Sequence, residues 1–245
     1  MGARYDTIGI NYARLRRADP RIAAQIEAAL GSAVSVLNVG AGTGSYEPVS
    51  RQVTAVEPSP EMIAKRPPGS APVVRAEAAN LPFADQSFDA TMAILTVHHW
   101  PNPHAGLSEI RRVTRGPIVL LTFDPAQRPW LTDYLPQLAA LDDAQMPAMA
   151  DYDRWLGPVD VRPVMVPHDC IDGFLYAYWR RPAAYLDPQI RSGSSSFWSI
   201  NDAGEGLARL QQDLESGAWG QRYADLAARD SYDAGYRLVI APGID

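Results

Sequence analysis

Three glycines at alternate positions follow a short apolar stretch, Val36–Val39. The apolar stretch is typical of a buried strand, and Gly40, Gly42 and Gly44 come directly after it. Glycine allows the backbone to turn sharply and a ligand to approach the main chain with no Cβ in the way. The spacing is G-x-G-x-G, which differs from the G-x-G-x-x-G of dinucleotide-binding loops. The sequence therefore predicts a strand ending in a tight turn; a ligand-binding turn and a purely structural one are both compatible with the triplet alone.

Strand-like and helix-like segments alternate around this loop. Short apolar runs predict strands at Val34–Val39, Val53–Glu57, Pro72–Ala76, Phe88–Leu95 and Ile118–Phe123. Helices are predicted from Pro20 to Gly31, at Pro60–Arg66 and at His104–Arg115. Short apolar strands alternating with helices predict an α/β fold with a mostly parallel sheet covered on both faces.

The second half of the chain adds two predicted strands, Val159–Val166 and Tyr236–Ala241, which bring the total to seven. Helices are predicted at Leu131–Leu141 and Ala148–Leu156. Residues 169–230, between the last two strands, are rich in helix-like and aromatic sequence. We expect them to form a helical lid that selects the substrate. No linker separates a second domain, so one domain is predicted over residues 1–245.

Composition excludes several classes of protein and of site. With 47% hydrophobic and 20% charged residues, the 245-residue chain is predicted to be globular. Its net charge of −6 makes nucleic acid an unexpected partner. The longest apolar runs are far shorter than the roughly 20 residues of a membrane span, and no signal peptide is visible, so a cytoplasmic protein is expected. Cys170 is the single cysteine, which excludes an intramolecular disulfide, and no metal-binding spacing occurs.

An acidic residue, Glu57, lies at the end of the second predicted strand, seventeen residues after Gly40. A carboxylate about 20 residues beyond such a loop accepts hydrogen bonds from ribose hydroxyls. Only eight residues separate Gly44 from Val53, and Pro48 is one of them, so little helix can follow the loop. A pyrophosphate favours a well-formed helix N-terminus there, whereas a nucleoside without phosphates does not need one.

Four segments occur in order over residues 34–123: VLNVGAGTG, AVEPSPEMI, AEAANLPFADQSFDA and LTVHHW. Together they resemble the class I S-adenosylmethionine-dependent methyltransferases, in particular the small-molecule and quinone-methylase-like branch. The resemblance implies S-adenosylmethionine as cofactor and S-adenosylhomocysteine as product. It also implies a Rossmann-like, doubly wound seven-stranded sheet with an antiparallel last strand. Residues 1–33 would cover the cofactor with helices, and residues 34–123 would bind it.

The same resemblance implies a site for each part of the cofactor. The glycines would lie under the methionyl and ribose parts, and Glu57 would hold the ribose hydroxyls. The segment before Leu81 would face the adenine, and the residue after the fourth strand would line the methionine channel. The cofactor-binding residues expected on this basis are Tyr12, Arg16, Asn38, Gly40, Gly42, Gly44, Glu57, Glu77, Ala78 and Leu95.

Asn38 departs from the family pattern, which usually has Asp or Glu at this position. An acid there favours the ammonium group of the cofactor. The carbonyl of Asn38 can accept the same hydrogen bond, but without the charge. We therefore expect the same cofactor, held with one charge fewer.

Candidate catalytic residues lie past the predicted strands. Methyl transfer is an in-line displacement that needs positioning, exclusion of water and, for a protic acceptor, a base. In an open parallel sheet the site lies beyond the carboxyl ends of the strands, where His98, His99 and Asp124 fall. His99 is the preferred base; helix capping and packing beside Trp100 are the alternative roles of the histidine pair. Asp124 is expected either at the substrate or as a turn initiator.

These expectations define the predicted function. The chain is expected to transfer a methyl group from S-adenosylmethionine to an O, N or C nucleophile of a small molecule, as a monomer or homodimer. The alternative is a cofactor-binding protein without methyl transfer, acting as a non-redox catalyst or a sensor. The glycine spacing disfavours a nicotinamide-dependent dehydrogenase.

Overall fold

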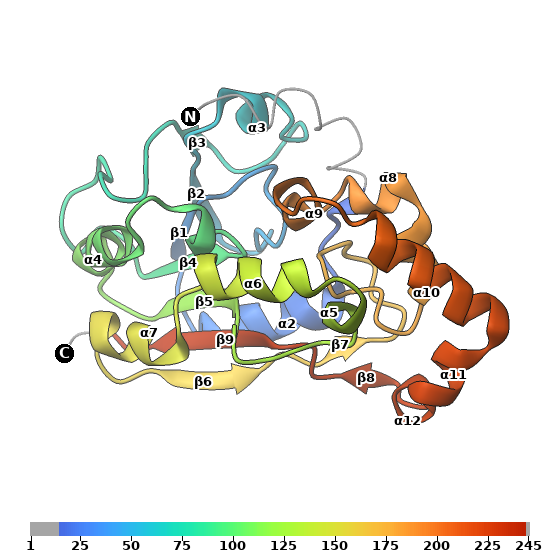
Figure 1. The fold of residues 1–245 in the computed structure, drawn as a ribbon. Helices are drawn as coiled ribbons and strands as arrows, with labels where there is room; N and C mark the ends of the chain where they lie inside the picture. The colour runs from blue at the N-terminus through green and yellow to red at the C-terminus, as the bar shows by residue number, and fades with distance from the viewer. Residues whose placement is uncertain (1–14, 244–245) are drawn as a thin grey trace. The chain divides into compact units, whose positions relative to one another are not determined.

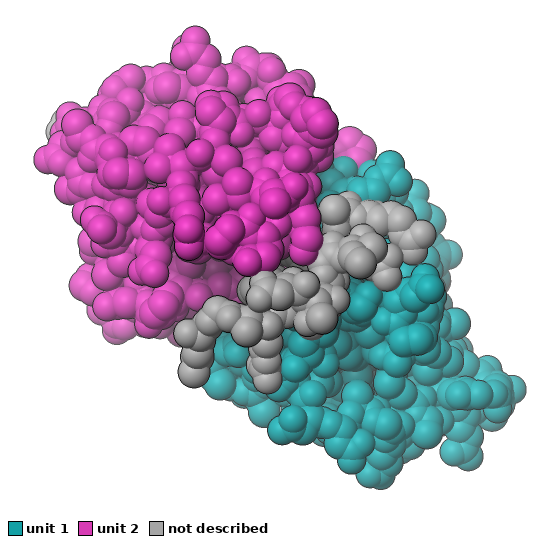
Figure 2. Space-filling view, turned by 90° about the horizontal axis from the view of Figure 1, so that it is seen from above, with its two compact units in different colours: residues 1–19, 125–145, 164–235 teal, residues 20–124, 146–163, 236–245 magenta. Residues whose placement is uncertain are grey.

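The computed structural model describes residues 15–243, and Figure 1 shows their fold. The chain divides into two compact units, which are coloured separately in Figure 2. Unit 1 comprises residues 1–19, 125–145 and 164–235, and unit 2 comprises residues 20–124, 146–163 and 236–245. The five strands predicted in the first half fall in unit 2, whereas residues 169–230 fall in unit 1. That the two units work as one domain stays a prediction.

Unit 2 is built on a seven-stranded sheet. Its strands are β1 (Ser35–Val39), β2 (Gln52–Val56), β3 (Val73–Val74), β4 (Ala90–Ile94), β5 (Ile118–Phe123), β6 (Asp160–Pro163) and β9 (Tyr236–Ala241). Their order is β3-β2-β1-β4-β5-β9-β6. The first five pair in parallel, and β9, drawn in red between β5 and β6 in Figure 1, pairs antiparallel with both. The predicted seven-stranded, mostly parallel sheet with an antiparallel last strand is confirmed.

Helices cover the two faces of this sheet. Those of unit 2 are α2 (Pro20–Ala29), α3 (Pro60–Ala64), the 3₁₀ helix η1 (Val97–His99), α4 (Pro103–Val113) and α7 (Met149–Leu156). Alternate buried residues of the strands, such as Leu37 and Leu120, share one apolar cluster with α4 and α7. The residues between them are also buried and point to the opposite face, where α2 lies against β5. Burial on both faces explains why β1, β4, β5 and β9 are mostly apolar, whereas the edge strand β6 is exposed along its length.

The structure differs from the predicted elements at two places, and a proline lies at each. The predicted helix Leu131–Leu141 is two helices, α5 (Leu131–Tyr134) and α6 (Pro136–Gln145), because Pro136 has no N–H to donate and keeps Leu135 out of the helical region. The predicted strand Val159–Val166 ends in the sheet at Pro163. Val166–Pro167 form β7, which pairs with β8 (Ser231–Tyr232) in unit 1.

Unit 1 is mostly helical. Beyond α5 and α6 it contains η2 (Pro182–Leu186), α8 (Pro188–Arg191), α9 (Ser195–Ser199), α10 (Gly204–Ser216), α11 (Ala218–Arg222) and α12 (Ala224–Ala227). Trp130 lies at the centre of its aromatic core, with ring centroids 5.3 Å from Trp219 and 5.6 Å from Tyr185. Within the predicted lid, the ring centroid of Tyr185 also lies 5.8 Å from that of Tyr178 and 6.3 Å from that of Phe197, so several aromatic residues of the lid pack against one another. Within the described residues, no helix is long and apolar enough to cross a membrane.

Candidate functional site

The candidate site of unit 2 lies at the edge where the parallel strands end. β1, β2 and β4 are hydrogen-bonded neighbours, so the residues that follow them lie side by side. The glycine loop follows β1, Glu57 follows β2, and Leu95 follows β4. The structure thus brings together, from three strands, residues that are far apart in the sequence.

The glycine loop has a backbone that only glycine adopts readily. Gly40, Gly42 and Gly44 have φ angles of +70°, +53° and +92°. The N–H groups of Gly40 and Ala41 both donate to the carbonyl oxygen of Val56, at 2.9 and 3.0 Å, and fix the loop to the end of β2. A Cβ on Gly40 would lie 2.0 Å from Oγ1 of Thr96. The first glycine is therefore required by its conformation and by its neighbour.

Glu57 closes the loop from the side of β2. Its side chain is buried, and Oε2 accepts a hydrogen bond from the N–H of Gly42 at 2.8 Å, while Oε1 accepts one from Ser59 at 3.0 Å. Burial raises the pKa of Glu57, against the two backbone N–H groups and Arg66, which lower it. A carboxylate oxygen has more than one lone pair, so both oxygens can still accept a hydroxyl. Glu57 fits the predicted role of holding ribose hydroxyls.

Backbone strain marks the end of β4. Leu95 has a φ of +52°, a left-handed conformation that is uncommon for a residue with a side chain. The N–H of Leu95 donates to Leu121 at 2.8 Å, and the next residue, Thr96, is buried. Such strain costs about 1–3 kcal/mol and is concentrated at functional sites. The hydrogen bond to Leu121 helps to hold Leu95 in this conformation, and Thr96 lies against Gly40 of the glycine loop.

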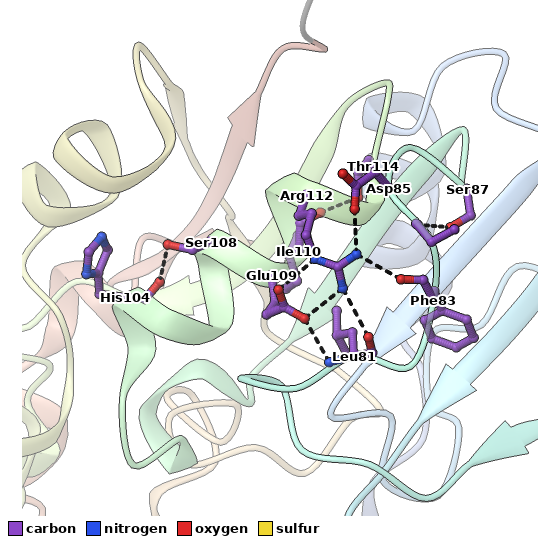
Figure 3. Close-up of polar contacts among 11 residues, drawn as sticks. Leu81, Phe83, Asp85, Ser87, His104, Ser108, Glu109, Ile110, Arg112 and Thr114 are labelled. Atoms are coloured by element: carbon purple, nitrogen blue, oxygen red, sulfur yellow. Dashed lines mark hydrogen bonds and ion pairs between the residues drawn. The ribbon is translucent and has the colours of Figure 1, made fainter.

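The predicted adenine-side residues precede a segment that α4 holds in place. Figure 3 shows the guanidinium of Arg112 at the centre of a set of hydrogen bonds. It donates to the carboxylate of Glu109 at 2.7 and 2.8 Å and to that of Asp85 at 2.8 Å. It also donates to the backbone carbonyls of Phe83 and Leu81 at 2.8 and 3.0 Å. Glu109 in turn accepts from the N–H of Leu81 at 3.0 Å, and Arg112 lowers its pKa. Leu81 and Phe83 belong to a motif that is visible in the sequence, whereas no sequence pattern indicates the contacts of Arg112.

Glu77 and Ala78 themselves have different environments. Glu77 is exposed, and its carbonyl accepts a hydrogen bond from Asn80 at 3.0 Å in a turn. Ala78 is buried and lies against α4, where a Cβ on Gly106 would come within 3.2 Å of the Ala78 Cβ and 2.6 Å of the Trp100 ring. The exposed acid and the buried alanine are compatible with their predicted places beside the adenine, which stay predictions.

The catalytic candidates fall on two different strand ends. η1 places His98 half-buried and His99 exposed, with ring centroids 3.9 Å apart. Asp124 follows β5, and its Oδ2 lies 3.6 Å from Nε of Arg237 on β9, both side chains being largely buried. Asp124 therefore has an ion-pair partner that the sequence did not reveal. No group of three potential metal ligands occurs in the part of the chain that the structure describes.

Two predicted residues belong to the N-terminal segment. Tyr12 lies outside the described residues. Arg16 belongs to unit 1, where its Nε donates to Oδ1 of the fully buried Asp172 at 2.7 Å. The predicted pairing of Arg16 with a cofactor carboxylate stays a prediction, and the contact with Asp172 is an additional role.

Glu47 and Arg66 were not singled out from the sequence. Their ion pair, 2.8 Å long, is almost fully buried beside the glycine loop, and Asn38 donates to Glu47 at 3.1 Å. The two residues are separated by 19 positions on irregular segments, so no periodic pattern in the sequence connects them.

Comparisons with known proteins agree with this geometry. A family model described as a methyltransferase domain matches residues 37–117. A crystal structure from Anabaena variabilis, named "Putative methyltransferase from antibiotic biosynthesis pathway", is 34% identical, with a TM-score of 0.86 over 93% of this chain and 98% of that chain. No curated protein matches the sequence.

More distant structures share the fold alone. Geranyl diphosphate C-methyltransferase from Streptomyces coelicolor, solved with S-adenosylhomocysteine, is 16% identical, with a TM-score of 0.53 over 92% of this chain and 77% of that chain. The [4+2]-cyclase SpnF is 17% identical, with a TM-score of 0.50 over 91% and 80%. The fold is thus found in proteins named for different reactions.

Proposed function

The chain belongs to the class I S-adenosylmethionine-dependent methyltransferases, and we propose that its methyl acceptor is a small molecule. The observation that carries the proposal is the 34% identical relative, which aligns over nearly the whole of both chains and whose name refers to antibiotic biosynthesis. The net charge of −6 further disfavours a nucleic-acid acceptor. The acceptor atom is an O, N or C nucleophile.

The residues present fit the cofactor. The positive-φ glycines bring backbone close to a ligand, the buried carboxylate of Glu57 can accept ribose hydroxyls, and no helix follows the loop to favour a pyrophosphate. Asn38, Glu77, Ala78 and Leu95 also belong to the proposed binding set, as do Tyr12 and Arg16 of the N-terminal segment. When bound, S-adenosylmethionine supplies an electrophilic methyl group and a thioether leaving group.

The protein's own residues have two tasks in this reaction. The glycine loop and Glu57 fix the cofactor so that the acceptor can approach in line with the bond that breaks. For a protic acceptor we assign proton removal to the histidine pair, with His99 preferred, since η1 follows directly on the strained end of β4. Asp124 is proposed to contact the substrate from the end of β5. Residues 169–230 are proposed to select the substrate as a lid, and residues 1–33 to cover the cofactor.

A single-turnover assay tests this function. The purified enzyme is mixed with S-adenosylmethionine labelled in its methyl group and with an extract of small metabolites, and labelled products are separated by mass. We expect label in a small organic product. A cofactor that binds tightly but leaves no labelled product would instead support a binding protein without transfer.

We also propose a cytoplasmic enzyme, because the single cysteine needs no oxidising compartment.

A further inference from the structure

A buried carboxylate contacts the side chain of Asn38. Oε1 of Glu47 accepts from Nδ2 of Asn38 at 3.1 Å, and both oxygens of Glu47 accept from Nη2 of Arg66 at 2.8 Å. The N–H of Ala71 donates to Oε2 at 3.4 Å. The side chains of Glu47 and Arg66 are 10% and 5% exposed. The contacts are therefore made away from solvent, where they are little screened.

Arg66 also attaches this carboxylate to the glycine loop. Its Nη1 donates to the carbonyl of Gly42 at 3.2 Å, and its Nη2 donates to that of Ala71 at 3.1 Å. A Cβ on Gly44 would lie 3.1 Å from Oε2 of Glu47 and 3.2 Å from Nη1 of Arg66. The ion pair is thus packed directly against the loop, and its position is fixed by backbone on two sides.

The chemistry of a carboxylate decides how the Asn38 amide is turned. An ionised carboxylate only accepts hydrogen bonds, so Glu47 must face the NH₂ end of the amide. Because Nδ2 of Asn38 donates to Glu47, Oδ1 of the same amide is directed away from Glu47. Asn38 itself is 2% exposed and lies near the end of β1. A buried ion pair such as Glu47–Arg66 adds little to the stability of the fold. Fixing one orientation of the Asn38 amide is a role that fits its geometry.

We propose that Glu47, anchored by Arg66, is a positioning residue for the cofactor site: it orients the Asn38 amide so that Oδ1 accepts a hydrogen bond from the cofactor ammonium. The proposal rests on the methyltransferase function above. The proposal explains how the neutral side chain of Asn38 can bind the cofactor ammonium, because the Glu47 carboxylate fixes the orientation of the Asn38 carbonyl.

The variant E47Q tests the orientation. A glutamine at 47 can accept from or donate to Asn38, so the amide is free to turn its NH₂ end toward the ammonium. By calorimetry we expect E47Q to bind S-adenosylhomocysteine about tenfold more weakly, the loss of one hydrogen bond to a charged group. Binding of 5′-methylthioadenosine, which has no ammonium, should change less than twofold. Equal losses for the two ligands would show a general disturbance of the loop and overturn the proposal.

A second substitution should restore what E47Q loses. In N38D/E47Q the side chain at 38 only accepts, whichever way it turns, so we expect S-adenosylhomocysteine affinity to return to within twofold of the wild type. N102D/E47Q is the matched control, because Asn102 caps α4 and Asp caps a helix equally well. It should stay tenfold weak. Failure of N38D to rescue binding, or equal rescue by N102D, would contradict the proposal.

A measurement without ligand separates this proposal from the function on which it rests. In N38D alone, two carboxylates would lie at hydrogen-bond distance, and repulsion raises the pKa of such a pair. The melting temperature of the ligand-free N38D protein should then fall below that of the wild type at pH 8, and the deficit should shrink toward pH 5. Arg66 also lowers the pKa of Glu57, but Glu57 is present in both proteins and so does not account for a difference between them. A deficit independent of pH would overturn the proposed contact even if no cofactor bound.

Discussion

At the scale of single residues, the structure shows why particular positions in the loop allow no side chain. Gly40 needs both a left-handed backbone and space, because Thr96 packs where its Cβ would be. Gly31 has a similar φ of +58°, but a Cβ added there would meet no atom within 4 Å. Replacing Gly31 by alanine therefore measures the free-energy cost of the left-handed conformation alone, whereas replacing Gly40 adds the cost of a collision with Thr96.

We predict that G40A is considerably less stable than G31A. The left-handed conformation should cost each variant about 1–2 kcal/mol. The collision with Thr96 should add about 1–3 kcal/mol in G40A alone. Urea unfolding of the two variants measures the difference, and equal stabilities would show that Thr96 does not restrict this position.

The histidine pair yields a prediction about the reaction itself. If His98 and His99 remove a proton from the acceptor, H98A/H99A should lower kcat by roughly 10²- to 10⁴-fold, with most of the loss in H99A. The affinity for S-adenosylhomocysteine should not change. H104A is the matched control, since His104 is exposed and lies against Trp155 with ring centroids 5.8 Å apart. An unchanged kcat in the double variant would exclude a base in this pair.

At the candidate site, sequence patterns indicate the residues that lie in short, regular motifs. The contact of Glu57 with the glycine loop was predictable, because the loop and the next strand end have a fixed spacing. Glu47, Arg66 and Arg237 were not, because each finds its partner only after distant segments come together. A charged residue outside a periodic segment has the same sequence signature whether it is solvated or buried.

At the scale of elements, α4 is the support of the segment that follows Ala78. Arg112 uses its planar guanidinium to hold two carbonyls and two carboxylates at once. Lysine has the charge but not the fork of donors. The segment from Leu81 to Phe83 should therefore depend on arginine specifically.

We predict that R112K loosens this segment and weakens cofactor binding severalfold. Amide hydrogen exchange over residues 77–83 should become faster, and the affinity for S-adenosylhomocysteine should fall by about 1 kcal/mol, the value of one typical hydrogen bond. The control is R154K, whose exposed ion pair with Asp151 is expected to contribute little. Unchanged exchange in R112K would show that the segment is held by other contacts.

At the scale of the whole molecule, the number of strands and the mostly parallel sheet were predictable from the sequence, and the antiparallel last strand followed from the family resemblance. The order of the strands and the division into two units were not predicted. Parallel strands with short apolar runs allow few arrangements. The composition of unit 1 depends instead on contacts between remote segments, such as the pairing of Arg16 with Asp172 and of Asp19 with the N–H of Ile171. No local pattern in the sequence announces such contacts.

We infer that unit 2 holds S-adenosylmethionine on the glycine loop and Glu57. Titration calorimetry of the wild type and E57A with S-adenosylhomocysteine is the decisive test. We predict one site per chain in the wild type, and an affinity lower by about 1–3 kcal/mol in E57A, because hydrogen bonds from the ribose to a buried carboxylate are lost. No heat of binding to the wild type at millimolar ligand, or an equal affinity in E57A, would contradict it.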